Sequence, residues 1–169
     1  MIVHDRITTR IATPGDATAI SSLIAAALRQ TNAGDYPATV IDRMTTSYAA
    51  PRVVLMVQHR EMFVAERVGA IVGVIGYAAG SVRSLFVAPD DQGSGIGRRL
   101  IAEVESLARK ADLRSLTVAA SMTAIGFYQR CGFEELRPVN PAGIDMMLMH
   151  KWLLSVEFGS HLGDESFQK

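Results

Sequence analysis

Three glycines at alternate positions, Gly93, Gly95 and Gly97, form the stretch whose residue types and spacing most clearly suggest chemistry. Glycine lets a backbone turn tightly, which can bring several N–H groups to one point. Apolar residues with helical spacing begin at Leu100, so the turn opens into a helix whose first N–H groups have no partner within it. A helix start of this kind attracts anions, and phosphate groups in particular. The stretch therefore predicts a site for a phosphorylated ligand.

The glycine turn differs from two common phosphate-binding motifs. No Lys-Ser or Lys-Thr pair follows Gly97, so the turn is not a P-loop. Its glycines do not follow the G-x-G-x-x-G pattern, and they lie midway along the chain rather than in a first strand-to-helix turn. Taken alone, the turn is equally consistent with a connection that binds no ligand.

The apolar pattern predicts the elements that hold this turn. We expect helices after the first strand, from Pro37, from Gly97 to about Ala111, and between Ser121 and Gly132. Residues 51–60 form a short apolar run that periodicity alone does not assign. The content is α/β, or α+β by a stricter label, with a mixed sheet of six or seven strands flanked by helices. Strands are expected over residues 6–12, 62–67, 71–79, 82–87, 113–119, 133–137 and 145–153.

Length and composition indicate one globular domain, which we place at residues 1–154, with 155–169 as a mobile tail. The 17 basic and 17 acidic side chains cancel, which argues against nucleic acid as a partner. Cys131 is the single cysteine, so no intrachain disulfide can form and a reducing compartment is expected. No signal pattern is present, and no apolar run reaches the ~20 residues of a membrane span. We therefore expect a cytoplasmic protein without a membrane partner.

A second motif follows the glycine turn after one helix and one strand. It contains Ala124, Phe127, Tyr128, Gly132 and Phe133 at the spacing Ala-x-x-Phe-Tyr-x-x-x-Gly-Phe. Together with Gln92-x-x-Gly95-x-Gly97, this motif resembles the GNAT N-acetyltransferase superfamily, and the order of elements up to about Leu153 is also similar to that family. The resemblance implies a GNAT-like, mostly antiparallel sheet.

The resemblance also implies acetyl-CoA as a cosubstrate. Backbone N–H groups at the glycine turn would bind the pyrophosphate, and the strand before it would pair with the pantetheine arm. An amide of that strand would polarise the thioester carbonyl, as in an oxyanion hole. The residues that the resemblance assigns to the cosubstrate are Leu85, Phe86, Val87, Gln92, Gly93, Ser94, Gly95, Ile96, Gly97, Arg98, Ser121 and Tyr128.

The resemblance implies two catalytic roles, of which one is clearly filled. Tyr128 would act as general acid for the departing thiolate, because a phenol donates a proton without first carrying a charge. The second role is that of a general base, which many members fill with a glutamate in the strand over residues 82–87. That strand has no carboxylate here, so Glu66 is the best carboxylate candidate, although a solvated hairpin charge explains it equally well. His59 and His150 are weaker candidates.

The function that follows is transfer of an acetyl group from acetyl-CoA to a small-molecule or peptide amine by direct attack. The acceptor pocket would lie within residues 28–56, with Tyr36, Met44 and Tyr48 as lining candidates. Ser121 stands where the wider family often has asparagine, and Cys131 is expected to serve packing. The alternatives are a catalytically idle acyl-CoA-binding sensor and a nucleotide-binding α/β domain. The last strand and the tail could mediate a homodimer.

Overall fold

The computed structural model describes residues 6–153, and the predictions for residues 1–5 and for the tail at 155–169 lie outside this range. All strands of the described range form one seven-stranded sheet, in agreement with the predicted count. The strands are β1 (Ile7–Ile11), β2 (Glu61–Arg67), β3 (Ala70–Ala78), β4 (Ser81–Val87), β5 (Ser115–Ala120), β6 (Glu134–Val139) and β7 (Met146–Trp152).

The helices also lie where the sequence predicts them, with one addition. Within residues 6–153, no helix is both long enough and apolar enough to span a membrane. The helices are α1 (Ala17–Gln30), α2 (Ala38–Ser47), α3 (Ala50–His59), α4 (Ile96–Lys110) and α5 (Ile125–Arg130), and short 3-10 turns are η1 (Pro14–Asp16), η2 (Pro89–Asp91), η3 (Met122–Ala124) and η4 (Pro141–Gly143).

The additional helix is α3, which occupies the segment that periodicity leaves unassigned. Pro51 lies in its first turn, where the missing amide hydrogen of proline costs no helical hydrogen bond. Val53 is fully buried on the inner face, while Leu55 on the outer face is 55% exposed. Tertiary packing of one face thus outweighs the strand propensity of the valines in this run.

The strand order is β1-β2-β3-β4-β5-β7-β6, and β4–β5 is the parallel pair in an otherwise antiparallel sheet. The mixed, mostly antiparallel prediction is therefore confirmed. β6 extends further than predicted and includes Pro138. Because β6 lies at the edge of the sheet, a residue without an amide hydrogen is tolerated there.

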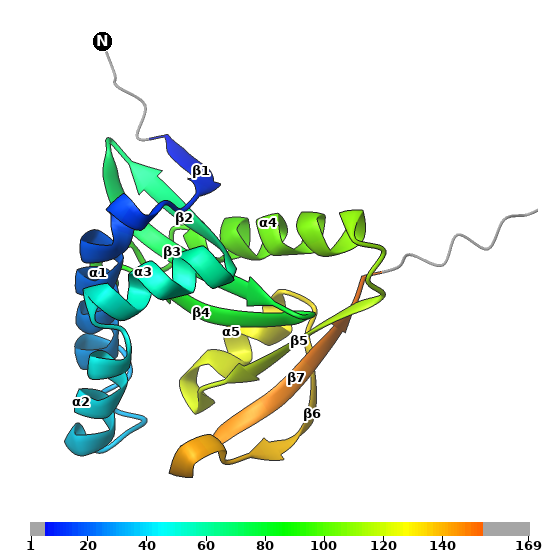
Figure 1. Cartoon of the computed structure of the whole chain (residues 1–169). Helices are drawn as coiled ribbons and strands as arrows, with labels where there is room; N and C mark the ends of the chain where they lie inside the picture. Colours follow the sequence, from blue (N-terminus) through cyan, green and yellow to red (C-terminus); the bar gives the residue numbers. More distant parts are fainter. Residues whose placement is uncertain (1–5, 154–169) are drawn as a thin grey trace, which may run out of the picture.

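Two apolar cores cover the two faces of the sheet. α4 and α5 pack on one face, around Leu100, Val104 and Met149. α1, α2 and α3 pack on the other face, around Ile20, Ile24 and Val74, and Figure 1 shows these three helices together beside β1–β4. The inner face of α1 is formed by buried apolar residues at helical spacing, which are Ile20, Leu23, Ile24, Ala27 and Leu28.

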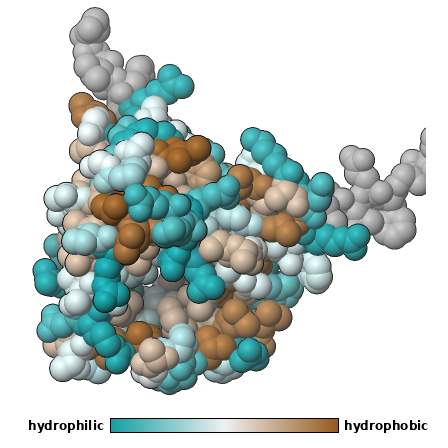
Figure 2. All heavy atoms as spheres, in the orientation of Figure 1, coloured by the Kyte–Doolittle hydropathy of each residue, from teal (hydrophilic) through white to brown (hydrophobic). Residues whose placement is uncertain are grey.

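The sheet opens between its two halves. β4 and β5 pair only at Ser81–Thr117 and Val82–Val118, and beyond these residues the two strands diverge (Figure 1). In the same orientation, Figure 2 shows a hollow below β4, between α1 and α2 on one side and the junction of β5 and α5 on the other. This opening is the position at which both sequence motifs meet.

Candidate active site

A β-bulge in β4 shapes the upper wall of the opening. The register with β3 shifts between Val74 and Gly76, so that one β3 residue faces Ser84 and Leu85 together. Ser84 has a φ of 54°, a left-handed conformation that a residue with a side chain seldom adopts. Beyond the bulge, no described residue of β5 pairs with Leu85, Phe86 or Val87. Their edge of β4 is therefore open to an extended ligand.

Tyr48 holds the bulge from the helical side. Its hydroxyl lies 3.1 Å from Ser84 Oγ, and its ring contacts the edge of Phe86 at a centroid distance of 5.5 Å. Tyr48 stands directly after α2, so the acceptor-side helices contact the strand that carries the open edge. The prediction of Tyr48 as a lining residue stays a prediction, but the structure brings it to the bulge.

The glycine turn presents unpaired backbone N–H groups. Gly93 and Gly95 have φ values of 78° and 84°, and a side chain added at either position would meet no atom within 4 Å. Glycine is therefore required there by backbone conformation and not by crowding. Among the described residues, no backbone carbonyl accepts from the amides of residues 93–98, and the first such bond in α4 is Arg99 N to Gly95 O at 3.1 Å. The arrangement can cradle an anion.

Gly97 has a different role from the other two glycines. It is buried inside α4, and a Cβ at this position would lie 3.0 Å from two ring carbons of Phe127. The glycine thus allows α5 to pack closely against the first turn of α4. Ile96 beside it is 1% exposed and contacts the sheet, where Gly73 leaves room for its side chain. Only the backbone of Ile96 is available to a ligand.

Side chains around the turn fix its shape. Gln92 donates to Thr31 Oγ1 at 2.8 Å and to the Val87 carbonyl at 3.3 Å, so it joins the turn to the end of α1. The Ser94 hydroxyl donates to the Asp91 carbonyl, and Asp91 also pairs with Arg67. Arg98 is exposed and donates to the Arg130 carbonyl, whereas Arg99 donates to a carbonyl of β1.

Tyr128 lies in the apolar core next to this turn. It is 6% exposed, and its ring contacts the edges of Phe127 and Phe133 at 5.2 and 5.4 Å. Burial, and then the nearby Cys131 thiol, raise the pKa of Tyr128 well above that of a free phenol. The hydroxyl therefore keeps its proton at neutral pH. Leu85 and Val87 pack against the same core, so the open strand edge and Tyr128 border one cluster.

The lower wall of the opening carries polar residues from the α1–α2 loop that sequence reasoning did not select. Thr123 Oγ1 donates to Asp35 Oδ2 at 2.6 Å, and Asn32 Nδ2 lies 3.3 Å from the same oxygen. Asn32 also reaches Ser121 Oγ at 3.5 Å. Ser121 stands at the N-cap of η3, although its side chain makes no capping bond. The sequence feature that could have pointed to Asp35 is its position in a polar loop between two amphipathic helices.

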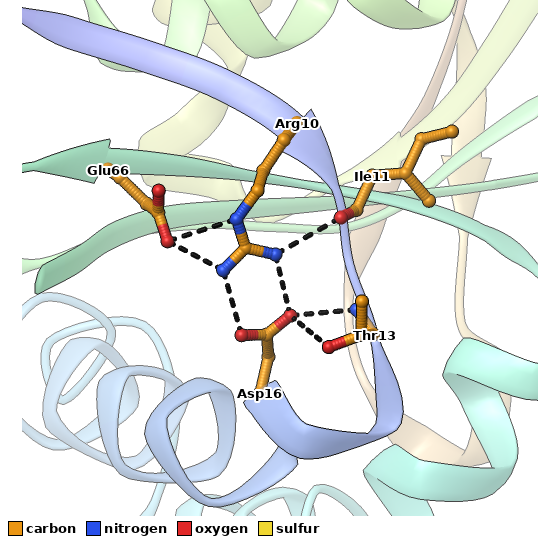
Figure 3. Close-up of polar contacts among 5 residues, drawn as sticks. All are labelled: Arg10, Ile11, Thr13, Asp16 and Glu66. Atoms are coloured by element: carbon orange, nitrogen blue, oxygen red, sulfur yellow. Dashed lines mark hydrogen bonds and ion pairs between the residues drawn. The ribbon is translucent and has the colours of Figure 1, made fainter. Parts of the chain in front are cut away.

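Glu66, on β2, is held in an ion-pair network beside β1, which is an edge strand of the sheet. Arg10 lies between two carboxylates, with Nη2 at 2.6 Å from Glu66 Oε1 and Nη1 at 2.8 Å from Asp16 Oδ2 (Figure 3). This pairing lowers the pKa of Asp16 well below its usual range. A general-base role for Glu66 stays a prediction, and the ion pair does not favour it.

The weaker candidates lie apart from the opening. His59 is exposed at the end of α3, and His150 on β7 faces Trp152 at a ring distance of 5.6 Å. Cys131 is 8% exposed within the core, and burial raises the pKa of its thiol. Packing, the role expected for this cysteine, agrees with its position.

Comparisons with known proteins agree with the fold and with the family that the sequence resembles. A model of the acetyltransferase (GNAT) domain matches residues 26–153. The IAA acetyltransferase of Azospirillum brasilense is 36% identical over 91 residues, which are 48% of this chain and 60% of that protein. The chain thus spans less than two thirds of the length of that relative.

Two solved structures share the architecture. A GCN5-related N-acetyltransferase from Rhodopseudomonas palustris superposes with a TM-score of 0.81 at 23% identity, covering 90% of this chain and 99% of that one. The PaiA N-acetyltransferase of Thermoplasma acidophilum, solved with coenzyme A, has a TM-score of 0.75 at 18% identity, covering 87% and 99%. With the family match, these results define the class: the chain belongs to the GNAT acetyltransferase family.

Proposed function

We propose that the protein is an N-acetyltransferase that transfers the acetyl group of acetyl-CoA to an amine by direct attack. The observation that carries this proposal is the open edge of β4 beyond Val82, which leads directly into unpaired amides at residues 93–98. A strand edge suits an extended amide-containing arm, and the amides suit a pyrophosphate. The coenzyme A bound to the Thermoplasma relative supports the same ligand here.

The chemistry of the site residues suits an acyl-CoA. Gly93 and Gly95 leave open space over the amides, and Leu85, Phe86 and Val87 offer main-chain groups to the pantetheine. An N–H of this segment, close to the bulge at Ser84, would stabilise the charge that develops on the thioester oxygen. Arg98 would add positive charge beside the phosphates.

Tyr128 completes the proposed reaction on the thiol side. The amine nitrogen attacks the thioester carbon, the C–S bond breaks, and the sulfur takes the phenolic proton of Tyr128. Burial keeps that proton on the oxygen until it is needed. The elevated pKa also makes the phenolate a strong base, so it readily recovers a proton from the nitrogen after attack.

A thiol-release assay with acetyl-CoA over a diverse library of amines tests the proposal. We expect release of free CoA thiol that depends on one class of amine, with the acetylated amine identified by mass spectrometry. Binding of acetyl-CoA without thiol release from any amine would instead establish an idle acyl-CoA-binding module. Tighter binding of ATP or NAD than of CoA would contradict the assignment of the ligand.

A further inference from the structure

One polar group near the lower wall of the opening, the hydroxyl of Tyr36, has no hydrogen-bond partner among the described residues. Tyr36 lies in the α1–α2 loop and is 9% exposed. The Ser121 hydroxyl acts on the pKa of Tyr36, but the two groups do not reach hydrogen-bond geometry. A buried hydroxyl without a hydrogen-bond partner is destabilising, so it indicates a site at which a ligand group can form the missing hydrogen bond.

Asp35 stands beside this hydroxyl with one oxygen available. Its two side-chain donors among residues 6–153, Thr123 and Asn32, both bond to Oδ2, which leaves Oδ1 without a partner in this range. Burial raises the pKa of Tyr36, and the negative charges of Asp35 and of Asp145, in the β6–β7 loop, act in the same direction. Two loops thus bring negative charge to one buried, neutral hydroxyl.

The other partly buried carboxylates of the described range are engaged elsewhere. Each has a short contact with a cation, a hydroxyl or an amide away from the opening: Asp16 and Glu66 with Arg10, Asp91 with Arg67, Glu103 with Thr9, and Glu105 with Lys151. Asp35 combines partial burial, contact with the β5–α5 junction and a carboxylate oxygen without a partner in the described range. None of the five carboxylates named above has all three features.

We propose that Asp35 Oδ1 and the Tyr36 hydroxyl bind the ammonium group of a cationic primary amine, and that Asp35 accepts the proton which this group must lose. The inference rests on the proposed N-acetyl transfer and names its acceptor class. It also supplies the carboxylate that β4 lacks.

The proposed step balances without a further reactant. The ammonium gives one proton to Asp35, and the neutral nitrogen then attacks the thioester carbon. A C–N bond forms, the C–S bond breaks, and the sulfur takes the proton of Tyr128. Tyr128 recovers the second proton that the nitrogen loses, and the proton on Asp35 leaves to water. The net products are the amide, the CoA thiol and one proton.

The decisive experiment compares Asp35→Asn with Asp42→Asn on two kinds of acceptor. Asp42 is exposed on α2 and carries the same charge, so it serves as the matched control. The acceptors are 2-phenylethylamine, an ammonium at pH 7, and 4-ethylaniline, which is uncharged. We expect kcat/KM for the ammonium to fall at least about tenfold in Asp35→Asn, with the arylamine and the control changed less than about twofold.

Two further variants separate charge recognition from structural support. Tyr36→Phe keeps the ring and removes only the unpaired hydroxyl, so KM for the ammonium should rise while the melting temperature stays unchanged or increases. Thr123→Val removes a donor to Asp35 but leaves its charge. A Thr123→Val defect equal to that of Asp35→Asn would overturn the proposal.

The outcomes also separate this inference from the proposed function. If no amine of either kind is acetylated, the proposed function fails. If the wild-type protein acetylates arylamines alone, or if Asp35→Asn and Asp42→Asn behave alike, N-acetyl transfer stands and the assignment of Asp35 is wrong.

Discussion

At the scale of single residues, Tyr128 combines nearly complete burial with an edge contact to an aromatic ring on either side. Both features fix the ring and favour the neutral phenol over the phenolate. A departing thiolate is a weaker base than the phenolate of this residue, so the phenol gives up its proton only while the nitrogen, made acidic by its attack on the thioester, replaces it.

Replacing Tyr128 with phenylalanine removes the hydroxyl and keeps the packing of the ring. We expect kcat to fall by about tenfold to a hundredfold, at the low end of general acid effects because a thiolate leaves readily even without protonation. The affinity for CoA should change less than about threefold. Steady-state thiol release and calorimetric titration measure the two quantities, and an unchanged kcat would remove Tyr128 from the acid role.

The contact between Tyr48 and Ser84 is a second feature at the residue scale. Ser84 holds a strained conformation, and such strain persists only where surrounding contacts maintain it. We expect a double-mutant cycle with Tyr48→Phe and Ser84→Ala to give a coupling free energy of about 0.5–1.5 kcal/mol. Urea unfolding of the four proteins measures it. Strict additivity would mean that the hydroxyl pair does not support the bulge.

At the scale of elements, the first turn of α4 serves two neighbours at once. Its amides have no backbone acceptor within residues 6–153, whereas Gly97 faces Phe127 of α5 and Ile96 fills the space above Gly73. The position of the anion cradle is therefore set by helix–helix and helix–sheet packing. The contact between Gly97 and Phe127, together with the hydrogen bond from Arg98 to the Arg130 carbonyl, couples the two sequence motifs.

A glutamate at position 95 tests the cradle. Gly95→Glu places a side chain and a negative charge over the unpaired amides, so we expect CoA affinity to fall by at least about a hundredfold, because like charges meet at close range. Gly80→Glu is the matched control, since Gly80 has a φ of 78° and equally open surroundings at the other end of β4. Equal CoA affinity in the two variants would exclude the cradle.

At the scale of the whole molecule, the Arg10 network joins the first strand to the entrance of α1 and to β2. Arg10 receives two ion pairs, and the Asp16 carboxylate also accepts from the backbone N–H of Thr13 at 2.7 Å. The network is the main polar tie between β1 and the helical layer over it. It serves the fold and lies away from the opening.

The lowered pKa of Asp16 predicts how stability depends on pH. Between the unfolded value of about 3.9 and the lower folded value, the unfolded chain binds more protons, so stability rises with pH in this window. We expect Asp16→Asn to cost about 1–2 kcal/mol at pH 7 and to converge with the wild type as the pH falls towards 2. Denaturant unfolding across pH measures this, with Asp42→Asn as a control. A constant difference at every pH would contradict it.

Much of the fold and half of the site follow from local patterns in the sequence. The glycine turn and the Phe127-Tyr128 motif are each contiguous in the sequence, so local residue types were enough to predict them as candidate site residues. The assignment of α3 as a helix did not follow from the sequence. The packing of Val53 decides between helix and strand, and packing is not a local property.

The sequence predicted an acceptor pocket within residues 28–56 but could not single out Asp35, for a related reason. Asp35 and Thr123 are 88 residues apart, and only the folded loops bring them together. Glu66 carried the right functional group for a base, but its partner Arg10 lies 56 residues away on another strand. Carboxylates are common at surfaces, so residue type alone does not distinguish a free one from a paired one.

The insertion of β7 between β5 and β6 has a consequence for the growing polypeptide. β6 pairs only with β7 in the described sheet, and β5 shares just two residue pairs with β4. A nascent chain that ends before Met146 therefore leaves both strands without their main neighbour. The half of the sheet against which α5 packs closes only after β7 has left the ribosome, so ribosome-bound intermediates should complete the first half of the sheet well before the second.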